Sequence, residues 1–148
     1  MKHRGNTSDY IEERNQDVMR AYYELLHSSE NIVLQELTKK LVNMPSRRFW
    51  VSEERVAIVC AKMMKGDKLK NMRPTTRRMY KEIYKRVIAY KKKNPAMALA
   101  DIAFYVVRQP APRFYLTPGS ANVIIQRTKK KVFEQRMKRL KHMFNPIK

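Results

Sequence analysis

The sequence predicts an all-α protein made of two tandem three-helix repeats, followed by a long basic C-terminal helix. The main observation is an internal repeat: the segment PSRRFWVS at 45–52 recurs as PAPRFYLT at 110–117, which is 65 positions later. Apolar residues elsewhere recur at helical spacing, and strand signals are nearly absent. Because a repeat of this length usually corresponds to one supersecondary unit that packs against its neighbour, we expect a duplicated helical module.

The repeat and its flanking residues divide the chain into five parts. We expect a flexible N-terminal segment at 1–7, a near-neutral helical repeat at 8–66, a linker at 67–73, a basic helical repeat at 74–131 and a basic helical extension at 132–148.

Start and stop signals place three helices in the first repeat. One starts near Ser8, with acidic residues in its first turn, and a second covers about 32–43 and ends before Pro45. Ser52 is a good N-cap for the third helix, and Gly66 ends it.

The second repeat follows the same pattern. We expect helices from about 75 to 92 and from 95 to 108, and a last helix that opens at Thr117 with Pro118 at its first position. No break signal interrupts this last helix before Phe144. The aromatic segments 49–51 and 114–116 have the composition of extended chain, and whether they pair as a two-stranded ribbon is left open.

Charge is strong and unevenly distributed. The formal net charge is +20, with 13 basic and 10 acidic residues in 1–72 but 20 basic and 3 acidic residues in 73–148. A charge of this size points to a polyanionic partner, above all nucleic acid. We therefore expect the first repeat to serve packing or self-association and the second repeat to bind the polyanion.

Other features limit the class of protein. Cys60 is the only cysteine, which excludes an internal disulfide and favours a reducing compartment. No apolar run has the length of a membrane span, and no signal peptide is apparent. We expect a cytoplasmic or nucleoid-associated protein, or a virion component if the host is a virus.

The last two helices of each repeat, at about 30–65 and 95–131, resemble a helix-turn-helix with a long connector. The plan is similar to that of tandem DNA-binding repeats of the Myb kind. This resemblance implies that the third helix of each repeat enters the major groove of duplex DNA.

Helical spacing separates the two faces of the last helix. Its predicted core face holds Ala121, Ile124, Ile125 and Thr128, and its predicted outward face holds Gly119, Asn122, Gln126 and Lys129. Amide side chains match the major-groove edge of adenine, and backbone amides at a helix start suit phosphate. The predicted nucleic-acid-binding residues are Arg113, Gly119, Ser120, Asn122, Gln126, Arg127, Lys129, Lys130, Lys131, Arg136, Lys138 and Arg139.

The equivalent face in the first repeat holds Glu54, Ala57, Ala61 and Met64, which neither attract phosphate nor discriminate bases. For Arg48 and Arg113, a structural role as a helix cap or a ring-stacking group is weighed against phosphate contact.

Catalysis and cofactor binding are not expected. His3, His27 and His142 are dispersed, and no Cys-x-x-Cys, His-Glu-x-x-His or glycine-rich phosphate loop occurs. The favoured function is therefore a non-enzymatic DNA-binding protein, for example a transcriptional regulator. The alternative is a structural or assembly component of a virion or nucleoprotein, which contacts packaged nucleic acid or an acidic partner protein.

Overall fold

The structure is a computed structural model that describes residues 10–31 and 33–144. These residues form six helices and no strand, which confirms the all-α class. The helices are α1 (Ile11–Ser28), α2 (Leu34–Leu41), α3 (Glu53–Met64), α4 (Pro74–Lys93), α5 (Leu99–Val107) and α6 (Pro118–Phe144). The expected segment 1–7, the helix start near Ser8 and residues 145–148 lie outside the described residues.

Helix boundaries recur with the offset of the sequence repeat. α2 and α5 start 65 residues apart, at Leu34 and Leu99, and α3 and α6 also start 65 residues apart. α3 ends just before Gly66, whose φ of +99° suits the glycine that commonly follows a helix, whereas α6 continues to Phe144.

The predicted hydroxyl caps are present at the start of α3 and α6. The Arg55 amide donates to Ser52 Oγ at 3.1 Å, and the Ser120 amide donates to Thr117 Oγ1 at 3.1 Å. Each cap satisfies a backbone donor that has no partner within the first turn of its helix.

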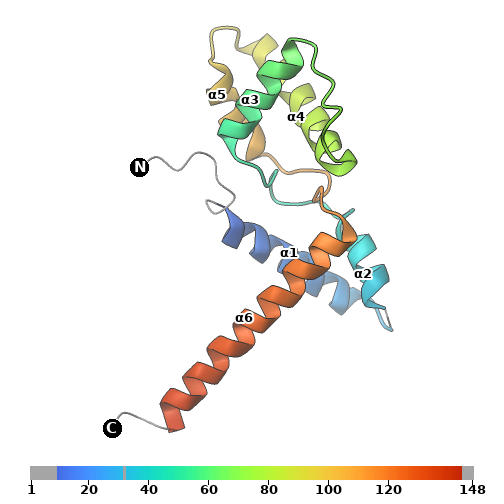
Figure 1. Cartoon of the computed structure of the whole chain (residues 1–148), viewed down its shortest axis with the longest axis vertical. Coiled ribbons are helices and arrows are strands. Elements are labelled where there is room, and N and C mark those ends of the chain that lie inside the picture. Colours follow the sequence, from blue (N-terminus) through green and yellow to red (C-terminus); the bar gives the residue numbers. More distant parts are fainter. Residues whose placement is uncertain (1–9, 32, 145–148) are drawn as a thin grey trace.

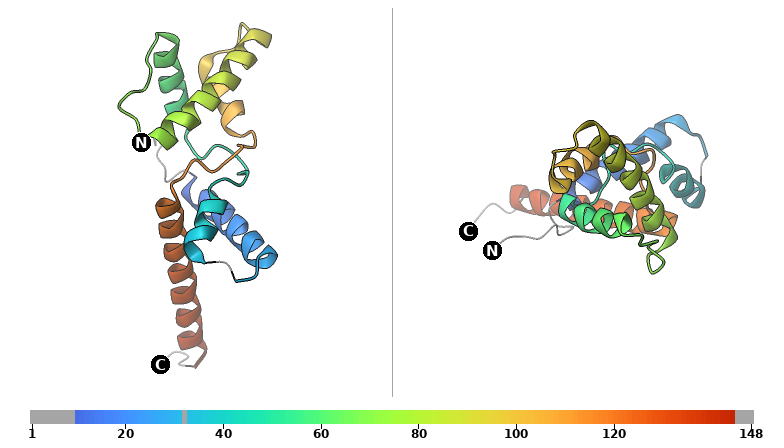
Figure 2. Two further views of the ribbon diagram at one scale, coloured as in Figure 1. Left: turned by 90° about the vertical axis from the view of Figure 1, so that its right-hand side faces the viewer. Right: turned by 90° about the horizontal axis from the view of Figure 1, so that it is seen from above.

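The six helices pack as two three-helix bundles that exchange their third helices. α3 packs against α4 and α5 in one bundle, while α6 packs against α1 and α2 in the other (Figure 1). The left view of Figure 2 shows the same separation along the long axis. Each bundle has its own core: Val59, Cys60, Ile83 and Val106 are among the residues of the first, and Val18, Leu37, Leu41 and Ile125 are among those of the second.

This grouping differs from the expected arrangement of tandem three-helix repeats at 8–66 and 74–131, because the third helix of each repeat packs on the first two helices of the other. A helix-turn-helix returns its last helix through a tight turn, but here the second and third helices of each repeat are joined by longer connectors, at 42–52 and 108–117, which cross. Each connector therefore delivers its helix to the bundle formed by the other repeat.

The two connectors meet at equivalent positions. Ser46 and Ala111, 65 residues apart, form an isolated antiparallel bridge in which each amide donates to the other carbonyl at 3.0 Å. Beyond it, the Phe49 amide donates to the carbonyl that ends α5, and the Phe114 amide donates to the carbonyl that follows α2. The rings of Phe49 and Phe114 are buried in opposite bundles.

A buried carboxylate fastens the first connector to α1. Asp17 has no exposed surface, and its Oδ2 accepts from the Arg47 amide at 2.8 Å and from Trp50 Nε1 at 3.0 Å. Its Oδ1 accepts from Nε and Nη2 of Arg20 at 2.9 and 2.7 Å. A buried charge is tolerated because its oxygens are satisfied in this way.

The second repeat uses a related device. Arg86 donates to Glu82 at 2.9 Å and to the Pro110 carbonyl at 2.9 Å, as Arg20 donates to the Pro45 carbonyl at 3.2 Å. Each arginine thus links an acid on the first helix of its repeat to the repeated proline at the start of a connector.

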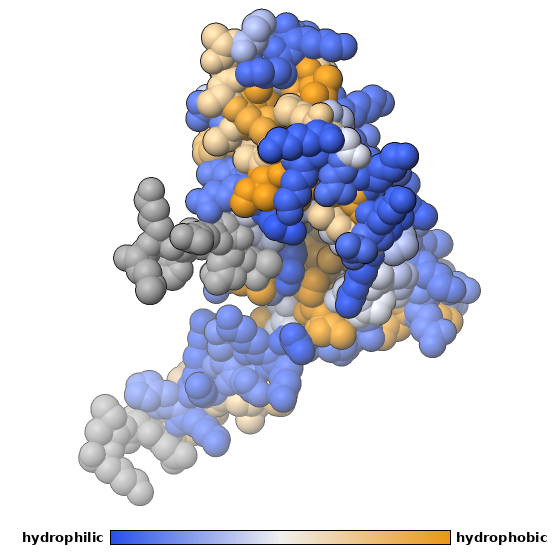
Figure 3. Space-filling model, turned by 45° about the horizontal axis from the view of Figure 1, so that its top comes forward, coloured by the Kyte–Doolittle hydropathy of each residue, from blue (hydrophilic) through white to orange (hydrophobic). Residues whose placement is uncertain are grey.

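The exchange also distributes charge over both bundles. The helices of the α1–α2–α6 bundle carry 12 basic and 6 acidic residues, and those of the α3–α4–α5 bundle carry 10 basic and 4 acidic residues, so each has a net charge of +6. Hydrophilic side chains cover most of the face shown in Figure 3, around smaller apolar patches. The second half of the sequence carries most of the positive charge, but the fold does not place that charge in one bundle and leave the other neutral.

Replacing Asp17 with alanine should destabilise the fold strongly. The Asp17→Ala variant leaves the Arg47 amide and the Trp50 indole without their acceptor and removes the buried partner of Arg20, which we expect to lower the free energy of unfolding by about 3 kcal/mol. Urea unfolding measures this loss. Glu24→Ala removes the exposed partner of the same arginine and should cost only about 0.5 kcal/mol, so equal losses would contradict the role assigned to Asp17.

Cutting the chain after Gly66 should leave the two fragments associated. Fragment 1–66 contains α1, α2 and α3, and fragment 67–148 contains α4, α5 and α6, so each bundle needs helices from both fragments. Native mass spectrometry of the cleaved protein should show a 1:1 complex near the 17.7 kDa of the intact chain. Separation into two independently folded fragments would contradict the exchange.

Candidate nucleic-acid interface

α6 extends well beyond the bundle to which it belongs. Ala121, Ile124 and Ile125 bury its N-terminal part against α1 and α2, as predicted, and Thr128 is half-buried at the edge. All residues from Lys129 to Phe144 are exposed. This free part of α6 has 16 residues and is therefore about 24 Å long.

Eleven of the twelve predicted binding residues lie on α6, and Arg113 lies on the connector that leads to it. Asn122 is half-buried and the other eleven are exposed. The residues on α6 share one helix but not one face of it, because their positions in the sequence place them all around the helix axis.

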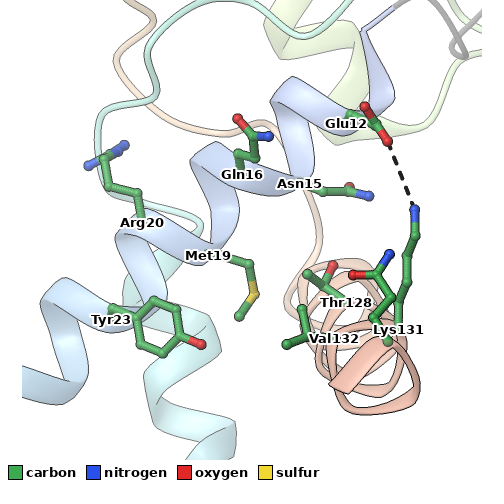
Figure 4. Close-up of a pocket in the computed structure, with 10 residues that line it drawn as sticks. Glu12, Asn15, Gln16, Met19, Arg20, Tyr23, Thr128, Lys131 and Val132 are labelled. Carbon is green, nitrogen blue, oxygen red and sulfur yellow. Dashed lines mark ion pairs between the residues drawn. The ribbon is translucent and has the colours of Figure 1, made fainter. Parts of the chain in front are cut away.

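Two of the predicted lysines are held against α1. Lys129 Nζ donates to the Tyr22 hydroxyl at 2.7 Å and lies 4.8 Å from the centre of the Tyr22 ring. Lys131 Nζ lies 3.9 Å from Glu12 Oε1 (Figure 4). Both side chains therefore have a structural partner.

A hollow of about 500 Å³ lies between α1 and α6 beside this ion pair (Figure 4). Met19 and Val132 provide apolar surface within it, and polar side chains such as Asn15, Gln16 and Gln135 surround them. A hollow at the equivalent place in the other bundle is lined by Lys81 and Tyr84 of α4 and by the end of α3.

Four other cations of α6 point away from α1 and α2 on one face. Arg127, Lys130, Lys138 and Lys141 are separated by 3, 8 and 3 residues, a spacing that returns to the same side of a helix. All four are exposed, and none forms an ion pair with another residue in the described ranges. We call these residues the α6 basic band; Glu134 is the one acid on the free part of α6.

α4 carries a second surface of the same kind. Arg78, Lys81, Lys85 and Lys92 recur at 3, 4 and 7 residues, are exposed, and have no hydrogen bond or ion pair to another described residue. We call them the α4 basic band. The set of predicted site residues omitted this band, although its spacing was visible in the sequence and could have identified it.

Several arginines have a different role from the lysines. Arg77 donates to the carbonyls of Leu69, Lys70 and Met72 in the loop before α4. Arg108 pairs with Glu53 and lies over the ring of Phe104. The planar guanidinium suits such multiple contacts, so much of the arginine charge is used inside the fold.

Arg48 and Arg113, which are equivalent in the repeat, differ in role. Arg48 donates to the carbonyls of Phe49 and Val51 at 3.1 Å and lies 5.2 Å from the Trp50 ring centre, which confirms a structural role. Burial and the nearby Arg108 charge lower its pKa. Arg113 is exposed, and its guanidinium forms no hydrogen bond with another described residue, while its carbonyl accepts from Ser46 Oγ at 3.4 Å.

The start of α6 faces a small hollow beside α2. Leu34, Thr38 and Lys39 line it together with Gly119 and Asn122. The Ser120 amide donates to its helix cap, Thr117 Oγ1, at 3.1 Å, so the expected approach to phosphate would compete with this hydrogen bond.

The two amide side chains of the predicted outward face contact each other. Gln126 Nε2 donates to Asn122 Oδ1 at 3.4 Å, so base reading would require this bond to open.

The helix that packs against α6 is not the one before it in sequence. α2 contacts α6, whereas α5 contacts α3 and α4. On the equivalent face of α3, Glu54 and Met64 are exposed while Ala57 and Ala61 are half-buried. Any helix-turn-helix pair that includes α6 is therefore formed by helices of both repeats.

Comparison with protein-family models, curated proteins and solved structures finds no match to this chain. No helix within residues 10–31 and 33–144 combines the length and apolar character needed to cross a membrane. In the same residues, no group of His, Cys, Asp and Glu side chains is placed to hold a metal ion. Cys60 is buried in the core of the α3–α4–α5 bundle, and burial raises its pKa to about 11.

Proposed function

We propose that this chain is a non-enzymatic protein that binds duplex DNA through the α6 basic band and the α4 basic band. The observation that carries the proposal is the set of eight exposed lysines and arginines in two straight bands, without acidic partners among the described residues. A cation that neither caps a helix nor pairs with a carboxylate is available for phosphate.

The dimensions of the α6 basic band suit a nucleic-acid backbone. Arg127 and Lys141 are 14 residues apart, which places them about 21 Å apart along the helix. Phosphates recur every few ångströms along duplex DNA, so several of them lie within reach of one such helix.

Sequence reading by α6 is the finer part of the proposal. Asn122 and Gln126 carry groups that match the major-groove edge of adenine, and α6 packs on α2 as a recognition helix packs on its partner. A protein that reads bases would serve as a regulator. A protein that binds only the backbone would serve in nucleoprotein assembly, and it would saturate arbitrary nucleic acid at a fixed stoichiometry.

Neutralising three residues of either band should weaken DNA binding and its dependence on salt. One triple variant replaces Arg127, Lys130 and Lys138 with glutamine, and a second replaces Arg78, Lys81 and Lys85. Each should lower the slope of log affinity against log salt by about 2 to 3, because about 0.9 counterions are released per phosphate contact. Fluorescence anisotropy with a random-sequence duplex at several salt concentrations measures this slope.

A matched control removes the same charge elsewhere. Lys40, Lys65 and Lys70 are exposed and belong to neither band, so their replacement by glutamine should change the slope by less than about 1. If all three triple variants lose affinity equally, only the net charge matters and the bands are not the contact surface.

Loss of base reading should change sequence preference rather than overall affinity. Asn122→Ala and Gln126→Ala should each alter the sequences recovered by selection from a random duplex library. Gln135→Ala, on the side of α6 that faces α1, is the control and should leave the recovered sequences unchanged. An unchanged preference in all three variants would restrict the proposal to backbone binding.

A further inference from the structure

The free part of α6 exposes a row of large apolar side chains that phosphate binding does not explain. Phe133 is 63% exposed, Met137 41%, Leu140 44% and Phe144 77%. No other described helix covers them, and a shallow depression along the row is lined by Phe133 and Met137 together with three charged residues. Contiguous exposed apolar surface of this kind marks interaction sites.

The four residues form one narrow seam. Their separations are 4, 3 and 4 residues, the spacing by which one helix packs against another. Arg136 and the exposed Met143 lie beside the seam on one side, and Glu134 and Lys141 lie on the other, so charged side chains border the seam on both sides. A helix that lies on a membrane surface needs a broader apolar face than this seam provides.

The charge of the free part of α6 indicates which kind of partner would suit the seam. The free part of α6 carries seven basic residues and one acidic residue. If a second copy paired with it in parallel, Arg136 would face Lys141 of that copy, which is a repulsive arrangement at the flanking positions of a helix pair. Glutamate or aspartate at those positions of a partner helix would instead face both cations favourably.

We propose that the seam of Phe133, Met137, Leu140 and Phe144 is a docking site for an acidic amphipathic helix of a partner protein. The apolar face of that helix covers the seam, and its carboxylates pair with Arg136 and Lys141. The α4 basic band belongs to the other bundle and stays free in such a complex. This inference goes beyond the proposed function and does not rest on it.

The test uses the full chain and a designed peptide as the probe. The peptide has four heptads with leucine at the two core positions and glutamate at the flanking positions, and a second peptide carries lysine in place of glutamate. Titration calorimetry should detect binding of the glutamate peptide and none of the lysine peptide, and circular dichroism should show added helix on mixing.

Two double variants locate the contact. Met137→Gln with Leu140→Gln should weaken binding of the glutamate peptide at least tenfold. Ile58→Gln with Val123→Gln is the control, because Ile58 and Val123 are equally exposed at 50% and 45% and lie off the seam. The control pair should bind the peptide like the unmodified chain. Random-duplex affinity of the seam variant should stay within twofold, which separates this proposal from DNA binding.

Four results would overturn the proposal. In the first, both peptides bind equally or neither binds. In the second, the seam variant binds the glutamate peptide as well as the unmodified chain does. In the third, the seam binds anionic phospholipid vesicles but no peptide, and in the fourth, the chain alone forms a dimer that the seam variant dissociates. The last two would assign the seam to a membrane surface and to a second copy, respectively.

Discussion

The crossing of the two connectors at Ser46 and Ala111 is the constraint on which the rest of the structure depends. These equivalent residues exchange two backbone hydrogen bonds, and each connector then places its phenylalanine in the bundle of the other repeat. Asp17 holds the first connector against α1 through the Arg47 amide and the Trp50 indole. This crossing delivers α3 to α4 and α5, and α6 to α1 and α2, so that each core is closed by a helix of the other repeat.

The crossing also determines where the charge lies. α6, which together with α4 is the most basic helix, is placed on α1 and α2 from the near-neutral first half, and α3, which has no net charge, is placed on α4 and α5. Each bundle consequently presents one basic band to solvent. Two cationic surfaces on one chain suit a protein that follows a long polyanion or holds two parts of it, and they do not suit a division into one neutral and one binding repeat.

Within the fold, cations are used in two ways. Arginines such as Arg20, Arg48 and Arg86 bond carbonyls and carboxylates around the connectors, where a planar group with several donors is needed. The bands consist mainly of lysines, which are compact charges on flexible stems and meet phosphate without fixed geometry. The apolar seam at the end of α6 adds a surface of different chemistry, so the same helix carries both the proposed nucleic-acid surface and the proposed docking site for a protein.

The sequence by itself determined the features that depend on short segments of chain. The offset of 65 residues, the caps at Ser52 and Thr117, the length of the last helix and the buried face at Ala121, Ile124 and Ile125 all follow from local pattern, and the structure confirms them. Only the tertiary structure decided which bundle receives α3 and which receives α6, because both helices bury an apolar stripe at equivalent positions of the repeat and the local pattern does not distinguish them. The same holds for Arg48 and Arg113, and for Lys129 on Tyr22: equivalent or neighbouring residues have different roles because packing, rather than residue type, decides what surrounds them.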